Sequence, residues 1–212
     1  MTPHLAPHLV TGLVLAGGRG LRMGGVDKGL QEVLGKPLAW HVMRRLQAQC
    51  AQVSINANRN LVTYSTLGAP VWPDTVAEFA GPLAGFLTGL QQCNTPFLQT
   101  APCDVPYFPS DLVQRLGQAL TQQQAEMAIA SSTELDPQGQ VFEQRHPVFC
   151  LMHSSLRDSL SDFMAKGGRK IEDWLSLHHC VRVTWPNVSS DVPFFVNLNT
   201  PQDLSQLHNR LA

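Results

Sequence analysis

No apolar run in the chain approaches the roughly 20 residues of a membrane-spanning helix, and residues 1–12 contain no Lys or Arg. We therefore expect neither a membrane span nor a secretory signal peptide. Charged residues are also scarce, because they make up 15% of the 212 residues and leave a formal net charge of -1. Without a basic surplus, the chain has no global attraction to nucleic acid or to an anionic membrane.

Paired cysteines are missing as well. The sequence has five cysteines, an odd number, and none of them forms a Cys-x-x-Cys motif. This pattern predicts free thiols in a reducing cytoplasm rather than a disulfide framework or a zinc site. Cys103 lies beside Asp104 in a loop of functional interest, but we expect its thiol to be buried as a small apolar group.

The chain does contain an alternation of strand-like and helix-like segments, and its 43% of apolar residues suffices for the core of one α/β domain. Strands are expected at 10–16, 51–56, 70–72, 97–100, 127–130 and 146–152, with a last strand ending at residue 197. Helices are expected from Pro37, near 58–66, from Gly81, and at 109–120, 153–165 and 169–177. This order predicts a parallel sheet with helices on both faces and a ligand beyond the carboxyl ends of its strands.

The richest motif is the stretch 15–28, which follows the first expected strand and contains five glycines with Arg22 and Lys28. Its glycines allow a tight turn that exposes backbone N–H groups, and the two cations lie beside them, so the loop is suited to a nucleotide triphosphate. It is not a Walker A loop, since Val26 stands where Lys is required, and Met23 rules out the dinucleotide-binding Gly-x-Gly-x-x-Gly. The alternative is a glycine-rich turn with two solvated cations.

Polar side chains follow several of the other expected strands, which favours a single site at one edge of the sheet. Asp104 follows the strand at 97–100 and is a natural Mg²⁺ ligand in a triphosphate site, although it could instead cap the next turn. Asn56 and Asp74 end the second and third expected strands. They could contact a base or ribose by hydrogen bonding, or form turn motifs.

Three further groups are candidates for binding. Gly81 and Gly85 open a helix, where early N–H groups could face a phosphate or ribose and Gly85 would permit close approach of a ligand or a neighbouring strand. Asn197 and Asn199 alternate after the last expected strand, so both side chains should face one way. Arg169 lies in a second cluster of glycines and cations, which could bind a phosphate or form a solvated turn.

Several of these segments, in this order over nearly the whole chain, resemble the signature of the molybdenum cofactor guanylyltransferases. They are Leu15-Ala16-Gly17-Gly18, Arg22-Met23-Gly24-Gly25, Asp27-Lys28, Trp72-Pro73-Asp74, Gly81-Pro82-Leu83-Ala84-Gly85, the Asp104 segment, His146-Pro147 and Asn197-Leu198-Asn199-Thr200-Pro201. The resemblance implies a three-layer, Rossmann-like nucleotidyltransferase fold with a mostly parallel central sheet. It implies a single domain, 1–212, with a nucleotide-binding half over about 10–131 and a pterin-substrate half over about 132–212.

The resemblance also implies an activity: GMP passes from GTP to the phosphate of molybdenum-bearing molybdopterin, and pyrophosphate is released. The resemblance places the GTP contacts on Leu15, Ala16, Gly17, Lys28, Asn56, Asp74 and Asp104 and the pterin contacts on Asn197 and Asn199. From the residues themselves we add Gly18, Gly81 and Gly85 as nucleotide-binding, Arg22 as catalytic with Lys28 and Asp104, and Arg169 toward the pterin. Asp104 would hold Mg²⁺, with Mn²⁺ as the alternative metal. No general base is assigned, since a phosphate nucleophile is already ionised near neutral pH.

The alternatives differ in acceptor, nucleotide or class. A cytidylyltransferase acting on the same pterin usually has Leu-Ala-Ala-Gly where this chain has Leu15-Ala16-Gly17-Gly18. The additional glycine allows closer approach of the backbone, which favours the larger guanine. Another nucleotidyltransferase would act on a different phosphorylated small molecule, such as a sugar phosphate. A nucleotide-binding regulator or carrier would bind without turnover, and intact Lys28 and Asp104 argue against it. Transient contacts with molybdopterin-delivering proteins and apo-molybdoenzymes are compatible with catalysis.

Overall fold

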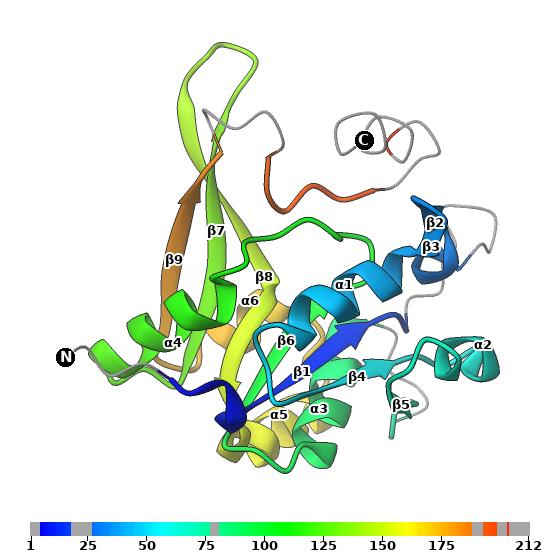
Figure 1. Ribbon diagram of the computed structural model, residues 1–212. Coiled ribbons are helices and arrows are strands. Elements are labelled where there is room, and N and C mark those ends of the chain that lie inside the picture. The colour runs from blue at the N-terminus through cyan, green and yellow to red at the C-terminus, as the bar shows by residue number, and fades with distance from the viewer. Residues whose placement is uncertain (1–4, 18–26, 77–80, 188–192, 199–202, 204–212) are drawn as a thin grey trace.

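A computed structural model describes residues 5–17, 27–76, 81–187, 193–198 and 203. Seven of the described strands form one sheet (Figure 1). In spatial order they are β5 Val71–Trp72, β4 Gln52–Asn56, β1 Val10–Leu15, β6 Phe97–Pro102, β8 Val141–His153, β7 Met127–Leu135 and β9 Cys180–Pro186. The short strands β2 Glu32–Val33 and β3 Lys36–Pro37 pair separately.

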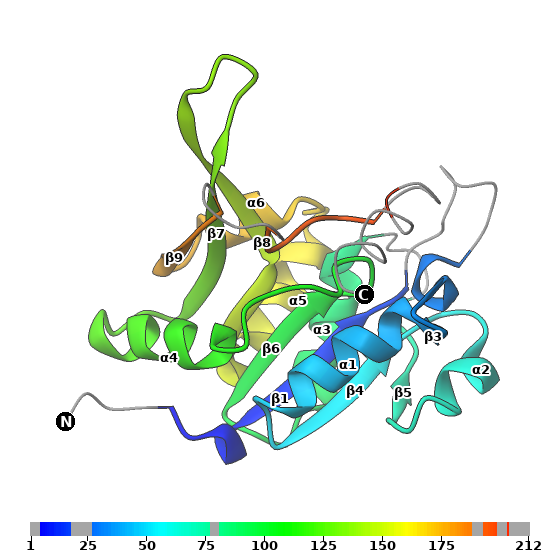
Figure 2. The ribbon, with the colours of Figure 1, turned by 45° about the horizontal axis from the view of Figure 1, so that its top comes forward.

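The sheet is mostly parallel, as the resemblance implied, with one strand reversed. The pairs β5–β4, β4–β1, β1–β6 and β7–β9 are parallel, whereas β8 runs antiparallel to both β6 and β7. The expected mostly parallel sheet is therefore confirmed, and the departure from parallel pairing is confined to β8. A short connection joins β7 to β8 as a hairpin, which an antiparallel pair allows and a parallel pair does not. This hairpin extends beyond the rest of the sheet (Figure 2).

Helices cover both faces of the sheet, as expected. They are α1 Leu38–Gln47, α2 Leu61–Ser65, α3 Pro82–Gln92, α4 Leu112–Gln122, α5 Arg157–Ala165 and α6 Ile171–Leu175, with 3₁₀ turns η1 Pro7–Leu9, η3 Lys28–Leu30 and η4 Ser154–Leu156. No helix in the described ranges is long and apolar enough to cross a membrane.

The alternation of side chains along β1 divides the core into two layers. Val10 and Val14 pack with the apolar faces of α1 and α4, whereas Leu13 packs with α3, α5 and α6 on the opposite face. Both layers are apolar side chains buried from water, which is the main favourable contribution to folding. The strand β1 therefore lies at the centre of the fold, and its carboxyl end leads directly into the glycine-rich stretch.

Near the amino end, Leu5 packs against Gly117 of α4 and Val10 is fully buried in β1, so both belong to the folded domain. The expectation for the last strand is wrong. The last described strand is β9, which ends at Pro186, and residues 193–198 form no strand. Phe195 has φ of 65°, which breaks the extended conformation that a strand ending at residue 197 would need.

Candidate nucleotide site

Lys28 and Asp104 lie 76 positions apart in the sequence and meet at the carboxyl edge of the sheet. Lys28 is the first residue of η3, and its Nζ donates to Oδ2 of Asp104 at 3.3 Å. Their side chains are 27% and 20% exposed, so both charges remain open to solvent. The pair places an ammonium that could contact a phosphate beside a carboxylate that could hold a metal, at the edge where parallel sheets bind ligands.

The backbone around this pair is fixed by the pairing of three strands. The N–H of Ala16 donates to the carbonyl of Asn56 at 2.8 Å, and the N–H of Cys103 donates to the carbonyl of Leu15 at 3.0 Å. The turn after β1 therefore lies between the turns after β4 and β6. Leu15, Ala16 and Gly17 are brought to this edge, whereas Gly18 and Arg22 lie outside the described residues.

Asn56 and Asp74 also meet, and they bind each other. Asn56 is 2% exposed, and its Nδ2 donates to Oδ1 of Asp74 at 2.8 Å and to the carbonyl of Trp72 at 3.0 Å. Asn58 donates to Oδ2 of Asp74 at 2.7 Å and accepts from its backbone N–H. The buried amide of Asn56 thus orients Asp74, so Asp74 is better placed than Asn56 to meet a nucleotide.

Gly81 and Gly85 are each required at the start of α3, the first for its backbone conformation and the second for lack of space. Gly81 precedes the helix with φ of 143°, a conformation that side chains disfavour. A Cβ at Gly85 would lie 2.5 Å from Leu15 Cδ2 and 2.6 Å from Asn56 Oδ1. Gly85 therefore allows α3 to pack closely against β1 and β4. Close approach of a neighbouring strand was one of the two roles expected for it.

We predict that Gly85→Ala destabilises the protein by about 1–3 kcal/mol, because its methyl group must displace the buried amide of Asn56. The free energy of unfolding in urea measures the loss. Gln92→Ala, at an exposed position near the end of the same helix, is the control and should change stability by less than about 0.5 kcal/mol. Equal stability of the two variants would contradict the packing described for Gly85.

The segment 193–198 reaches this edge without forming a strand. The N–H of Leu198 donates to the carbonyl of Asp104 at 2.9 Å, and the N–H of Phe195 donates to the carbonyl of Tyr107 at 3.0 Å. Asn197, which is exposed, is thereby held next to the Asp104 turn. Asn199 lies outside the described residues, and the alternation that would align it with Asn197 required a strand that is not there.

Arg169 lies in the loop between α5 and α6. Its guanidinium donates to the carbonyls of Met164 and Gly168, at 3.2 and 2.8 Å, and so lies against the carboxyl end of α5. A pterin role for Arg169 stays a prediction.

A polar cluster at the base of the β7–β8 hairpin was not expected from the sequence. Ser132 donates to Glu134 at 2.6 Å and bonds Nε2 of His146 at 2.7 Å, while the ring of His146 stacks on Phe195. Asn187 donates to Glu134 at 2.7 Å and exchanges hydrogen bonds with the backbone of Phe194. The cluster holds the segment 193–198, and with it Asn197, against the hairpin.

Burial lowers the pKa of His146 from 6.5 to about 4, against the opposing effect of Glu134. The unfolded chain therefore binds more protons between these values, and wild-type stability falls as pH drops from about 6.5 to about 4. We predict that His146→Gln loses less stability than wild type between pH 7 and pH 5, by about 1 kcal/mol after allowance for its partial exposure. Urea unfolding at both pH values measures the difference, and an equal pH dependence in the two proteins would contradict it.

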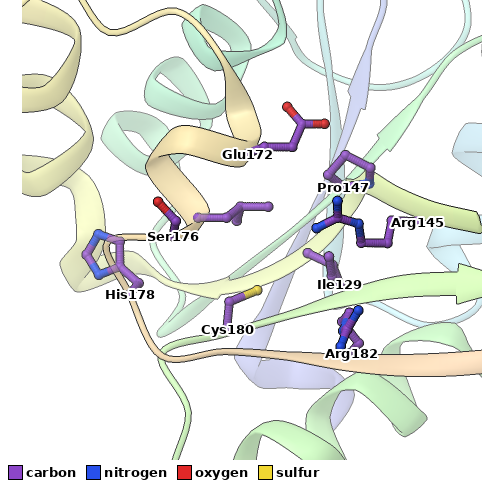
Figure 3. A pocket seen from close by; sticks show the side chains of 9 residues that line it. Ile129, Arg145, Pro147, Glu172, Ser176, His178, Cys180 and Arg182 are labelled. Atoms are coloured by element: carbon purple, nitrogen blue, oxygen red, sulfur yellow. The ribbon is translucent and has the colours of Figure 1, made fainter.

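A separate pocket of about 230 Å³ lies among α6, β7, β8 and β9 (Figure 3). Its lining consists of Ile129, Arg145, Pro147, Glu172, Leu175, Ser176, His178, Cys180 and Arg182. Ile129 and Leu175 belong to the core layer of α3, α5 and α6, whereas η3 contacts α1 on the other face. The pocket contains none of the sequence-predicted site residues and is distinct from the Lys28–Asp104 pair.

All five cysteines are free thiols, as the sequence predicted. Cys103 is 8% exposed. Burial raises the pKa of its thiol, and the negative charge of the neighbouring Asp104 raises it further. The thiol therefore stays protonated and packs beside the site as a small apolar group.

A mostly parallel α/β sheet with a Lys–Asp pair at its carboxyl edge is typical of enzymes that bind nucleotides, and comparison with known proteins identifies the class. Residues 12–182 match the model of the MobA-like NTP transferase domain. A molybdenum cofactor guanylyltransferase of Acidovorax ebreus is 53% identical over 202 residues, which cover 95% of this chain and 94% of the relative. One of Ralstonia nicotianae is 50% identical over 201 residues, covering 95% and 97%.

Solved structures agree on the fold. Molybdopterin-guanine dinucleotide biosynthesis protein A of Archaeoglobus fulgidus superposes with a TM-score of 0.70 at 21% identity, covering 94% of this chain and 97% of that one. A CMP:2-keto-3-deoxy-manno-octonic acid synthetase complexed with CTP gives 0.71 at 11% identity, covering 97% and 98%. The chain is a nucleotidyltransferase. It belongs to the MobA-like NTP transferases, within the family of the molybdenum cofactor guanylyltransferases, as its motifs indicated.

Proposed function

We propose that this enzyme transfers GMP from GTP to the terminal phosphate of molybdenum-bearing molybdopterin, forming the guanine dinucleotide cofactor and pyrophosphate. The observation that carries the proposal is the meeting of Lys28 and Asp104 at the carboxyl edge of β1 and β6. The names of relatives about half identical over nearly the whole chain support the choice of GTP and molybdopterin. The free thiols favour the cytoplasm as its compartment.

In the proposed reaction, a phosphate oxygen of the pterin attacks the α-phosphorus of GTP. A new P–O bond forms, the bond from the α-phosphorus to the bridging oxygen breaks, and pyrophosphate leaves with that electron pair. Two anions must approach each other, so positive groups control the barrier. Lys28 and Arg22 would face the phosphates, together with backbone N–H groups of the glycine-rich loop that begins at Gly17, because the Ala16 N–H already donates to Asn56.

The donor set around Asp104 fits Mg²⁺. The described residues contain no cluster of three His, Cys, Asp or Glu side chains, and Mg²⁺ needs only one or two carboxylates when phosphates and water complete its shell. We infer that Asp104 holds this ion, with Mn²⁺ as the alternative metal. When bound, the metal neutralises charge on the phosphates and on the leaving pyrophosphate.

The nucleotide would bind to the half of the domain formed by about 10–131, and the pterin to the half formed by about 132–212. Asp74, oriented by Asn56, would contact the nucleoside, and the amino end of α3 from Gly81 to Gly85 would face the ribose or phosphate. Asn197 and Asn199 would meet the pterin beside Asp104, with Arg169 offering a cation from the α5–α6 loop. Contacts with molybdopterin-delivering proteins and apo-molybdoenzymes would be transient.

The test supplies GTP, CTP and ATP separately with molybdenum-bearing molybdopterin and Mg²⁺, and follows the dinucleotide product by mass. Of the three nucleotides, we expect only GTP to yield the dinucleotide product, with release of pyrophosphate. Product from CTP but not GTP would replace this proposal with a cytidylyltransferase, and nucleotide binding without product would replace it with a non-catalytic role.

A further inference from the structure

We propose that Asp27 and Tyr64 are positioning residues that hold the Lys28 ammonium at the phosphate site. This inference rests on the proposed function, because it concerns the cation assigned to the triphosphate. Neither residue faces Asp104 directly in the described contacts, so each would act through Lys28.

Both oxygens of Asp27 are occupied by groups from one short segment after β4. The Tyr64 hydroxyl donates to Oδ1 at 2.6 Å, and Nδ2 of Asn60 donates to Oδ2 at 2.9 Å. The Nε of Arg59 lies 3.5 Å from the same Oδ2. The Asp27 side chain is 8% exposed, so these three groups replace most of its water. A carboxylate held by two hydrogen bonds and a guanidinium fixes its own backbone.

The Tyr64 hydroxyl also lies close to Gly29, the residue that follows Lys28. A Cβ at Gly29 would clash with that hydroxyl and would lie 3.3 Å from Sγ of Cys103. The backbone after Lys28 therefore rests on Tyr64, next to the residue that precedes Asp104. Tyr64 is fully buried, and burial raises the pKa of its phenol, so it remains a hydrogen-bond donor throughout the working pH range.

Charge placement gives these contacts a functional meaning. Asp27 is adjacent to Lys28 in sequence and would otherwise offer its ammonium a competing carboxylate. With both Asp27 oxygens occupied by Tyr64, Asn60 and Arg59, the Lys28 ammonium is directed to Asp104 instead. Removing the Tyr64 hydroxyl would leave one Asp27 oxygen free to draw Lys28 away from the phosphates.

A double-mutant cycle separates positioning from simple structural support. Tyr64→Phe keeps the buried ring and removes only the donor, and we expect it to lower kcat/KM for GTP about tenfold, as for loss of one charged hydrogen bond. In the Lys28→Ala background, the same substitution should change kcat/KM by less than about twofold. A full tenfold effect in that background would overturn the inference, as would no effect in the wild-type background.

A second variant keeps the test decisive if Tyr64→Phe folds poorly. Asn60 is exposed and has φ of 52°, a conformation that glycine adopts without strain. Asn60→Gly therefore removes one donor to Asp27 without disturbing the core, and the same non-additivity with Lys28→Ala is expected. Tyr107→Phe, the only other tyrosine-to-phenylalanine change that this chain allows, is the matched control and should leave kcat/KM unchanged.

The dissociation constant of GTP gives a second readout of the same cycle. If wild type binds GTP but makes no dinucleotide with molybdopterin, the proposed acceptor is wrong, and the cycle still tests positioning through GTP affinity. If wild type is active and the Tyr64 effect multiplies with that of Lys28, only the positioning role is wrong.

Discussion

Asp104→Ala is expected to lower kcat by about a hundredfold or more, because it removes the carboxylate proposed to hold the metal. Its side chain is 20% exposed and its described partner is Lys28, whereas the backbone carbonyl of Asp104 carries the bond to Leu198. Folding therefore depends on the backbone of Asp104 more than on its carboxylate. We expect the melting temperature to change by less than about 4 °C, equivalent to roughly 1 kcal/mol for a chain of this length.

Steady-state pyrophosphate release with GTP and molybdopterin measures kcat, and calorimetry measures the melting temperature. Asp158→Ala is a suitable control, since this carboxylate is 82% exposed and pairs with Arg157 away from the sheet edge. Asp158→Ala should retain wild-type turnover. Wild-type turnover in Asp104→Ala would exclude Asp104 as the metal ligand and would remove the main support for the site.

Lys28→Ala is expected to lower kcat/KM for GTP by about a hundredfold, because it removes a cation from the developing charge of the leaving pyrophosphate. The Lys28 side chain is 27% exposed, so its loss creates no large cavity. Lys28→Arg retains the charge in a larger, planar group and should recover part of the loss.

Initial rates over a range of GTP concentrations measure this effect. The control is Lys36→Ala, which removes an exposed cation whose Nζ lies 5.7 Å from the ring of Trp40. A similar loss in Lys28→Ala and Lys36→Ala would point to a general effect of surface charge. Full activity of Lys28→Ala would contradict the assignment of Lys28.

The local sequence pattern was sufficient to predict the strands and helices at the centre of the fold. The apolar run before Gly17 predicted β1, and Gly81 followed by Pro82 predicted the start of α3 at the observed residue. These features depend on periodicity and backbone preference within one segment. The edge where Lys28 meets Asp104 followed from them, since parallel neighbours place their carboxyl ends together.

The parts that were wrong or missed depend on contacts between distant segments. The reversal of β8 is decided by its pairing with β6 and β7, which no local pattern records. The segment 193–198 has strand-like residues, but hydrogen bonds to Tyr107 and Asp104 set its course instead. Tyr64 lies 37 positions from Asp27, so no local sequence pattern could predict the hydrogen bond between them. The run of polar residues 58–60 shortly after β4 was the one sequence feature that could have indicated hydrogen-bond partners for this turn.

The most direct test of the account follows two labels through a single turnover. GTP labelled at either the α- or the γ-phosphate is mixed with excess enzyme, molybdenum-bearing molybdopterin and Mg²⁺, and the products are separated. We predict that the α label appears in the dinucleotide and the γ label in pyrophosphate, and that Asp104→Ala slows both together. An α label recovered as free GMP or GDP, with none in a pterin dinucleotide, would contradict GMP transfer at this site.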